Sequence, residues 1–507
     1  MSGADGRSWL EPCAEFCRAE GLEPSLLKLL DGFRAPDPRG GPPPPPEPRA
    51  HGDFAALEAE LLVEPVFEDL AGELVGVDAK QAAMFARRLR SLDGAFAEAP
   101  EDAGARLLRV GFRQRLRGIV HAPGPRALRL RALGDFYYSH LARHRHRRRD
   151  LPSVVERLGA LAFEAVAPGL EHARVAQACA EGPVHLNVLR VDPQRVRLAV
   201  DDRREGVRAG QPFTEWTRQR GATAAVSGGF FLYSEPDIEA PSARYDPVGL
   251  LLGEGRCLSP PVFARGALLL DAEGGVAIEP LGLGGTHLRL ADGRPLDAAE
   301  AARWNRSRAR IGPDAPSLAI VGRRVVAVGR GLPVPLNGFV VPTPETVEVG
   351  AEVAYEPLRG SGGRPLVAGI AGGPMLLEGG ALTLDLRRED FWGSAPPVTF
   401  SQDETGDQNL LPRLAVGLDH AQRLVFVAVD GRDFGRALGM TLGGVGEVLQ
   451  ALGCHTATNL DGGASKRMVL RGRALDLSST ELQGSGDTAT AGRVRPVHSA
   501  ISMFADR

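Results

Sequence analysis

Near one end the chain reads Thr458-Asn459-Leu460-Asp461-Gly462-Gly463-Ala464-Ser465, where an apolar run breaks into a polar, glycine-rich turn. Asn459 and Asp461 alternate around Leu460, so on a strand both side chains point to one face of the sheet. The two glycines allow a sharp turn or a close approach to a ligand. A carboxylate, an amide, a hydroxyl and backbone N–H groups are what a site for an anionic sugar derivative needs. The alternative is an ordinary Asp-Gly-Gly turn.

A β-hairpin is predicted upstream of this turn. Residues 411–417 and 424–429 are strand-like and are joined by a four-residue polar turn. The expected register pairs Arg413 with Ala428, which makes Arg413 and Asp430 diagonal neighbours on one face. The planar fork of an arginine binds phosphate oxygens bidentately. The alternative is a surface ion pair beside an Asp-Gly turn.

The order of several motifs resembles the phosphodiester glycosidase family, which includes an uncovering enzyme that removes N-acetylglucosamine from a phosphodiester. The segments that carry the resemblance are, in chain order, 225–231, 371–376, 413–417, 429–432, 459–465 and 495–497. The resemblance extends roughly from Gly182 to the C-terminus. Three residues depart from the family pattern: Ser227 stands where Asn is usual, Ala464 replaces a third Gly, and Leu414 replaces a Thr or Ser.

The resemblance implies a hydrolase that cleaves the glycosyl–phosphate bond of a sugar 1-phosphodiester. Because the leaving phosphate monoester needs little protonation, such an enzyme must mainly hold the phosphate, stabilise an oxocarbenium-like transition state and supply water. The expected catalytic residues are Asp461, Asp430 and Arg413. The expected substrate-binding residues are Arg432, Asn459, Gly462, Gly463, Ser465, Gly372, Gly373 and Ser227. Residues 361–363 are a further glycine-rich candidate for contacts with the phosphate.

No cofactor is expected, and the alternative is a divalent cation held by carboxylates beside the phosphate. The sequence contains neither a Gly-x-x-x-x-Gly-Lys-Ser/Thr loop nor a Gly-x-Ser-x-Gly elbow at Ser227 or Ser465, which argues against a P-loop nucleotidase and an α/β-hydrolase. The expected partner is a small-molecule or glycan phosphodiester. Two other functions stay open: a non-catalytic binder of anionic glycans or cell-surface polymers on the same fold, and a nucleic-acid-associated protein acting through its basic helical region.

Three parts are expected along the chain. Residues 1–50 are expected to form a disordered or weakly helical tail with a proline-rich linker, because five consecutive prolines favour an extended spacer. Residues 51–180 are expected to be helical, with apolar residues at helical spacing in 81–97 and 153–179. Residues 181–507 are expected to form the phosphodiester glycosidase-like domain.

In the third part, strands and Gly/Pro turns dominate, and the expected helices are 214–220, 296–302 and 441–452. The predicted fold class is therefore α+β: a mixed β-sheet domain with few helices, preceded by a mostly helical N-terminal region.

Composition excludes little. The formal charge of −3 is close to neutral, and no stretch is apolar enough to span a membrane. Residues 1–7 lack a basic segment followed by an apolar one, so a cytoplasmic location is expected. The five cysteines are odd in number and widely spaced, which does not predict a disulfide framework.

One segment is strongly basic. Residues 106–149 contain thirteen arginines and a single carboxylate, Asp135. The acidic stretch 53–102 precedes it and offers internal partners, so nucleic acid is not the expected ligand. We expect this segment to act as a docking or stability element and not to take part in the chemistry.

Overall fold

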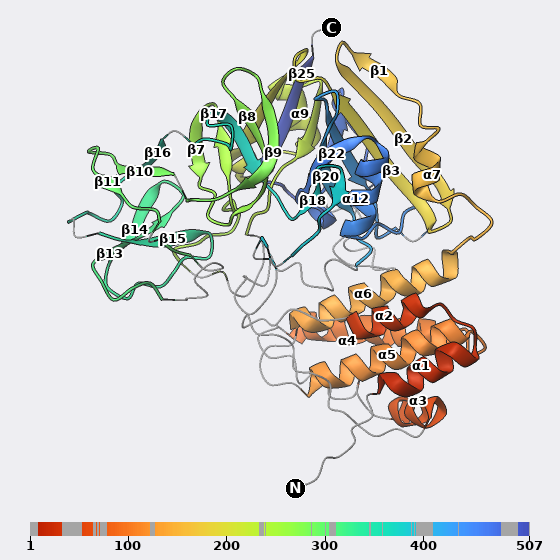
Figure 1. Cartoon of the computed structure of the whole chain (residues 1–507). Helices are drawn as coiled ribbons and strands as arrows, with labels where there is room; N and C mark the ends of the chain where they lie inside the picture. Colours follow the sequence, from red (N-terminus) through yellow and green to blue (C-terminus); the bar gives the residue numbers. More distant parts are fainter. Residues whose placement is uncertain are drawn as a thin grey trace.

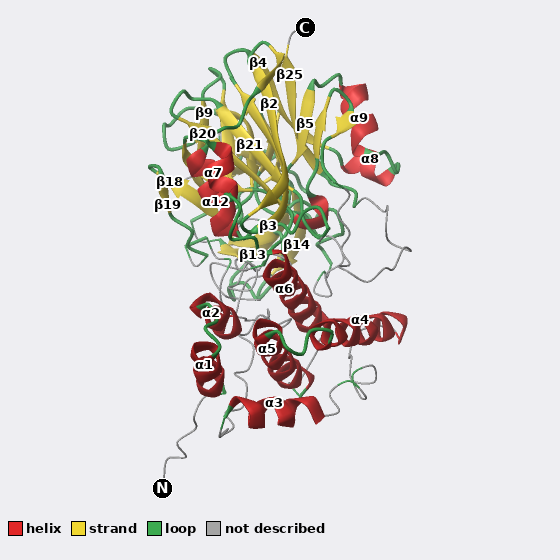
Figure 2. Cartoon of the chain, turned by 90° about the vertical axis from the view of Figure 1, so that its right-hand side faces the viewer, coloured by secondary structure: helices red, strands yellow, loops and turns green. Residues whose placement is uncertain are grey.

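The structure is a computed structural model that describes residues 9–32, 53–63, 67, 70, 79–121, 127–232, 238, 240–284, 286–299, 301–303, 311–343, 346–356, 358–386, 388–389, 391, 409–433, 435–477 and 495–505. Helices gather at the end of the molecule that holds the N-terminus, and the C-terminus lies at the opposite, strand-rich end (Figure 1). The α+β class is thus confirmed, with a mostly β C-terminal region (Figure 2).

The N-terminal helices share one apolar core. They are α1 (Leu10–Ala19), α2 (Pro24–Gly32), α3 (Phe54–Val63), α4 (Ala79–Ala97), α5 (Ala103–Val120) and α6 (Ala127–His146). Cys13, Leu30 and Phe112 are among its fully buried side chains, so residues 9–32 pack with the later helices although they were expected to form a weakly structured tail. The proline-rich linker lies outside the described residues.

A large sheet organises the β region. Its strand order is β1 (Glu164–Ala167), β2 (Leu170–Cys179), β3 (Gly182–Val191), β21 (Leu424–Val429), β20 (Arg413–Asp419), β22 (Cys454–Asn459), β18 (Met375–Glu378) and β19 (Ala381–Leu382). The helix expected over 153–179 is therefore wrong beyond α7 (Val154–Leu158). Pairing with β3 along ten residues of β2 overrides the helical preference of this alanine-rich segment.

The central strands of the large sheet are covered on both faces, which explains their nearly continuous apolar sequences. On one face Leu186, Val427 and Ala457 pack against α12 (Leu442–Ala451) and α7. Helix α12 starts at Thr441, whose hydroxyl accepts a hydrogen bond from the Gly444 N–H at 3.0 Å. The helix expected over 441–452 is thus confirmed, as is the one expected over 214–220.

The other face of the large sheet packs against two further sheets. The second sheet has the order β24 (Arg473–Ala474), β23 (Met468–Leu470), β5 (Ala224–Ser227), β25 (Ser499–Ala505), β4 (Val196–Asp202), and the third has the order β7 (Arg256–Ser259), β6 (Leu251–Gly253), β17 (Leu366–Ala371), β8 (Arg265–Asp271), β9 (Val276–Leu281). Phe426 of the large sheet, Ile501 of the second and Leu268 of the third are buried in this common core.

Smaller elements complete the fold. Two small sheets run β12 (Ala302–Arg303), β15 (Gly338–Pro342), β13 (Ser317–Val321), β14 (Arg324–Gly329) and β11 (Pro295–Leu296), β10 (His287–Leu290), β16 (Val353–Glu356), and the short helices are α8 (Arg204–Arg208), α9 (Phe213–Arg220) and η2 (Gly463–Ser465). The helix expected over 296–302 is wrong, since this segment joins β11 to β12.

Every named strand pair in the described residues is antiparallel, whereas a mixed sheet had been expected. Many consecutive strands are joined by short turns, as in β2–β3, β8–β9 and β20–β21, and a short turn can join only antiparallel neighbours.

The predicted hairpin forms as β20 and β21, but its register differs by one residue. Arg413 pairs with Val429, not Ala428. The turn is shorter than expected because Gln422 adopts a left-handed conformation, with φ of 61°. The Asp419 carboxylate accepts hydrogen bonds from Ala421 N at 2.9 Å and Arg423 N at 2.8 Å, which keeps Asp419 in the strand. A shift of one residue moves a side chain to the other face of a sheet.

All five cysteines are buried and free, in agreement with the absence of a predicted disulfide framework. None of the helices in the described residues combines the length and the apolar content needed to cross a membrane.

His498, next to β25, makes folding sensitive to acid. Its ring packs against Phe231 with centroids 4.7 Å apart, and its Nδ1 has no hydrogen-bond partner in the described structure. Burial, aided by the Arg204 cation, lowers the pKa of His498 to about 3. Because this pKa is below the ordinary value of about 6.5, folding favours the neutral ring. The stabilisation is complete above pH 6.5 and is lost as the pH falls from 6.5 towards 3.

We therefore expect His498→Phe to lose less unfolding free energy than the wild type between pH 7 and pH 4.5, as measured by urea denaturation. The matched control is His287→Phe, because His287 is exposed on β10. Equal pH dependence of wild type and His498→Phe would contradict this assignment.

Candidate active site

The predicted site residues come from strand ends at one edge of the large sheet. Arg413 begins β20, Asp430 follows β21 and Asn459 ends β22, and the pairings bring these ends together. Ser227 ends β5 of the second sheet. The expectation that distant segments meet here is therefore correct, although their side chains take different directions.

Arg413 and Asp430 point to opposite faces of the large sheet, so the predicted diagonal contact between them is wrong. The observed register places Arg413 with Val429 on the face covered by α12, and Asp430 on the face shared with the second sheet. The buried Arg413 guanidinium donates to the carbonyls of Met440 and Asn409, each at 3.0 Å. Arg413 thus holds Met440, which directly precedes the N-cap Thr441 of α12.

Asp430 lies in a buried ionic network. Its side chain is 1% exposed, and it forms an ion pair with the Lys466 ammonium, which is fully buried. Asp430 Oδ2 lies 2.5 Å from His185 Nδ1, and Oδ1 accepts from the Leu477 N–H at 3.1 Å. A second carboxylate, Asp476, lies 3.7 Å from Lys466 Nζ. Asp430 is therefore a carboxylate with most of its acceptor capacity already used.

Arg467 extends this network to Ser227. Its backbone N–H donates to Ser227 Oγ at 2.9 Å, and its guanidinium lies 3.8 Å from Asp476. Burial lowers the pKa of Arg467, while the negative charges of Asp476, Asp430 and Asp461 oppose that shift. The serine hydroxyl at position 227 thus holds the polypeptide next to β23.

The Asp461 turn lies beside these cations. The Asp461 N–H donates to the Gly228 carbonyl at 3.2 Å, and its side chain is only partly buried. Gly463 has a φ of 56° and donates its N–H to the Pro412 carbonyl at 2.7 Å. At Gly462 a Cβ would lie 2.7 Å from the Pro412 oxygen, so this position requires glycine. Ser465 is buried, and its hydroxyl accepts from Arg495 at 3.4 Å.

The Gly372-Gly373 segment joins the site through Asn459 only. Gly372 donates its N–H to the Gly266 carbonyl at 2.9 Å, and Gly373 donates to the Asn459 carbonyl at 2.8 Å. Asn459 Nδ2 donates to the Gly373 carbonyl at 2.9 Å, and Asn459 Oδ1 is buried without a partner in the described structure. Since both glycine N–H groups already bond to carbonyls, their expected role as phosphate donors receives no support from this geometry.

Arg432 reaches the site from a strained backbone position. Its φ of 59° is unusual for a residue with a side chain. One of its guanidinium nitrogens, Nη1, lies 3.8 Å from where a Cβ on Gly463 would be, so Arg432 faces the Asp461 turn. The other, Nη2, lies 3.9 Å from Asp135 of α6, which was expected to stay apart from the site. Arg432 is therefore the predicted phosphate ligand with the most suitable position.

The residues that sequence reasoning missed are His185, Lys466, Arg467 and Asp476. A signal existed for two of them, since Lys466 and Arg467 directly follow Ser465. His185 was visible as one of three polar residues, with Asn187 and Arg190, in a mainly apolar central strand. Asp476 carries no comparable signal.

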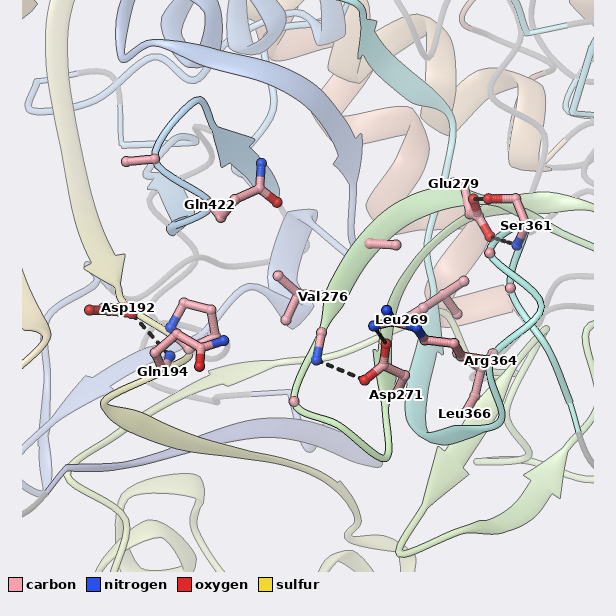
Figure 3. A pocket seen from close by; sticks show the side chains of 17 residues that line it. Asp192, Gln194, Leu269, Asp271, Val276, Glu279, Ser361, Arg364, Leu366 and Gln422 are labelled. Carbon is pink, nitrogen blue, oxygen red and sulfur yellow. Dashed lines mark hydrogen bonds and ion pairs between the residues drawn. The ribbon is translucent and has the colours of Figure 1, made fainter.

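A pocket of about 370 Å³ lies at the other end of the β20–β21 hairpin (Figure 3). Its lining includes Gln422 of the hairpin turn, Asp271 and Ser361. Ser361 donates its N–H to Glu279 at 2.6 Å. The glycine-rich segment 361–363 is thus separated from Asp461 by the length of β20, and its expected contact with the same phosphate is wrong.

No group of three or more His, Cys, Asp or Glu side chains among the described residues is arranged to hold a metal ion. The expectation that no cofactor is needed stays a prediction.

Residues 337–504 match the model of the phosphodiester glycosidase family. This part of the chain is similar to phosphodiester glycosidases. The match contains Arg413, Asp430, Arg432 and the Asp461 turn, but it begins well after Gly182 and so leaves out His185 and Ser227. At the level of the family, this similarity supports a glycosidase-type hydrolase.

Three solved structures are similar to the chain. A hypothetical protein from Synechocystis has 18% identity and a TM-score of 0.45, over 68% of this chain and 64% of that one, which is under two thirds of its length. A putative exported protein from Burkholderia pseudomallei has 22% identity and a TM-score of 0.44, over 65% and 75%. The zebrafish N-acetylglucosamine-1-phosphodiester alpha-N-acetylglucosaminidase catalytic domain, auto-inhibited by pro-peptide, has 14% identity and a TM-score of 0.40, over 71% and 95%. No curated protein matches the chain.

The buried ionic network of Lys466, Asp430 and Asp476 should contribute to stability. Asp430→Asn leaves Lys466 with a single carboxylate at 3.7 Å. An uncompensated buried charge costs about 3–5 kcal/mol of unfolding free energy, and Lys466→Met should likewise leave Asp430 and Asp476 short of a cation. The double variant should cost less than the sum of the two, because both charges of the pair are gone.

Urea denaturation of the wild type and these variants measures the effect. The exposed Asp314→Asn serves as control, with an expected change within about 0.5 kcal/mol. Additive effects of Asp430→Asn and Lys466→Met would show that the two side chains do not stabilise each other.

Proposed function

We propose that this protein hydrolyses the glycosyl–phosphate bond of a sugar 1-phosphodiester. The observation that carries the proposal is a partly exposed carboxylate, Asp461, beside buried cations within a region similar to phosphodiester glycosidases. Arg432 faces the same turn and Arg495 bonds Ser465 within it, so positive charge lies on several sides of the place where a phosphate would sit. No cofactor is part of this proposal.

Asp461 is the proposed base or charge stabiliser. It is the one predicted carboxylate with solvent access, whereas Asp430 is committed to Lys466 and His185. A carboxylate beside the anomeric carbon can activate water or stabilise the positive charge that develops there. Arg432 is the proposed phosphate ligand, since its fork can take two phosphate oxygens while the leaving group departs.

His185 and Asp430 provide a second candidate for the base. An ionised Asp430 accepts from His185 Nδ1 and so fixes the tautomer in which Nε2 is the acceptor nitrogen. In this version Asp430 is a positioning residue and acts through His185. Lys466 holds Asp430 in place through their buried ion pair.

The arginine-rich helical region does not favour a nucleic-acid function. Arg106, Arg109 and Arg113 of α5 form ion pairs with carboxylates of the helical region. These arginines are therefore largely neutralised within the protein. A soluble enzyme in the cytoplasm remains part of the proposal.

We expect Asp461→Asn to lower turnover by a factor of about 100 or more, the size of a lost acid–base or electrostatic group. The assay is a screen of sugar 1-phosphodiesters and nucleotide sugars for sugar release, with and without a chelator. Asp314→Asn removes the same charge from an exposed loop and should keep wild-type turnover. If Asp461→Asn retains turnover and His185→Gln loses it, the base is His185.

Arg432→Lys should raise KM by about tenfold and recover only part of the loss seen in Arg432→Ala, because an ammonium cannot replace a bidentate fork. Ligand binding without turnover by the wild type would overturn the hydrolase and favour a non-catalytic binder of anionic glycans.

A further inference from the structure

Positive charge is unevenly compensated in the helical region. Four arginines of α5 meet carboxylates of α3 or α4: Arg106 with Glu58, Arg109 and Arg113 with Asp93, and Arg117 with Glu60. The fifth, Arg115, donates to the Leu30 carbonyl. His144 of α6 likewise meets Asp102 at 2.9 Å. The acidic stretch therefore neutralises α5 as the sequence predicted.

The arginines at and after the C-terminal end of α6 have fewer carboxylate partners. Arg147 and Arg149 share one carboxylate, Glu23. Arg143 forms neither an ion pair nor a hydrogen bond with the residues that the structure describes. Burial, with the nearby Arg147 cation, lowers the pKa of Arg143, while the negative charges of Glu181, Glu23 and Glu447 oppose that shift. Partial burial of a guanidinium without a bound anion costs solvation free energy, and an anionic ligand would offset that cost.

These arginines line a pocket of about 680 Å³. Its charged side holds Arg143, Arg147 and Arg149, and its apolar side holds Leu22, Leu26 and Leu29 from α2 and the turn before it. Leu22 and Leu29 are only partly buried although they pack against the helical core. The pocket thus combines uncovered apolar surface with guanidinium groups.

We propose that this pocket binds a phosphate monoester that carries an alkyl or aryl group. Three arginines and one glutamate line the pocket, which is an excess of two positive charges, and a phosphate monoester carries a charge of up to −2. Glu181 and Glu447, which are outside the lining, offset part of the positive charge at Arg143. The phosphate pairs with Arg143, and the apolar group lies on the three leucines. A volume of about 680 Å³ is that of a small-molecule site and exceeds the size of a single inorganic phosphate.

The site is distinct from the proposed active site. Its lining comes entirely from residues of the helical region, whereas Asp461 and Arg467 lie among the strand ends of the β region. The proposal therefore does not depend on the hydrolase activity.

Titration calorimetry of the full chain tests the proposal with three probes: hexyl phosphate, inorganic phosphate and hexanol. Hexyl phosphate should bind about tenfold or more tightly than inorganic phosphate, and hexanol should not bind measurably. Arg143→Gln should weaken hexyl phosphate binding about tenfold or more, because a hydrogen bond between two charged groups is lost.

Arg145→Gln is the matched control. It removes the same charge two residues further along α6, but Arg145 donates to the Ala95 carbonyl and does not line the pocket. Its affinity for hexyl phosphate should stay within about twofold of the wild type. Leu29→Ala should weaken the binding of hexyl phosphate and leave the binding of inorganic phosphate unchanged. This result would show independently that the leucines bind the alkyl group.

Three results would overturn the proposal. One is the absence of hexyl phosphate binding by the wild type. Another is an equal loss in Arg143→Gln and Arg145→Gln, which would show general attraction by the basic helix. The third is a single-stranded oligonucleotide that binds more tightly than hexyl phosphate and depends on Arg143, since the ligand would then be a nucleic acid.

Discussion

The buried ion pair between Lys466 and Asp430 is the interaction on which the candidate active site depends. Asp430 follows the end of β21 in the large sheet, and Lys466 precedes β23 in the second sheet, so the pair ties two sheets together at the strand ends. Both side chains are almost fully withdrawn from water. Two charges in such a place are tolerated only when each has its partner, and the Asp461 turn lies directly between Asn459 and Lys466. The position of the turn is thus fixed from both sides.

Local signals predicted much of the fold. The strands around Arg413 and α12 with its Thr441 cap follow from apolar patterning and from a hydroxyl at the helix start. The errors arose where pairing partners decide the outcome. Residues 170–179 are alanine-rich and were expected to be helical, but they align with β3 along their whole length. A left-handed Gln422, which no single-sequence pattern shows, shifted the hairpin register.

The sequence predicted where the site residues lie, but not which contacts their side chains make. The strand ends that carry Arg413, Asp430 and Asn459 meet at one edge, yet Arg413 and Asp430 face away from each other because of that one-residue shift. The partners of Asp430 come from far along the chain, with His185 separated from it by 245 positions, and no local spacing reveals such a contact. Ser227 and the Gly372-Gly373 segment hold the backbone through hydrogen bonds to Arg467 and Asn459. Residue type alone therefore cannot separate side chains that bind a substrate from side chains that hold the fold together.

Helix α6 shows how charge placement divides structural from functional side chains. Asp135, in the middle of the helix, lies between Arg88 of α4 and Arg432 of the site, at 4.0 Å and 3.9 Å. Asp135 is the single carboxylate in the basic segment, and it pairs with Arg432 of the β region. At the end of the same helix Arg143 has no ion pair among the described residues, although the charges of Glu181, Glu23 and Glu447 act on it. What distinguishes Arg143 is that it lines a pocket together with Arg147 and Arg149, and this placement is the reason to assign it to a ligand that comes from solution.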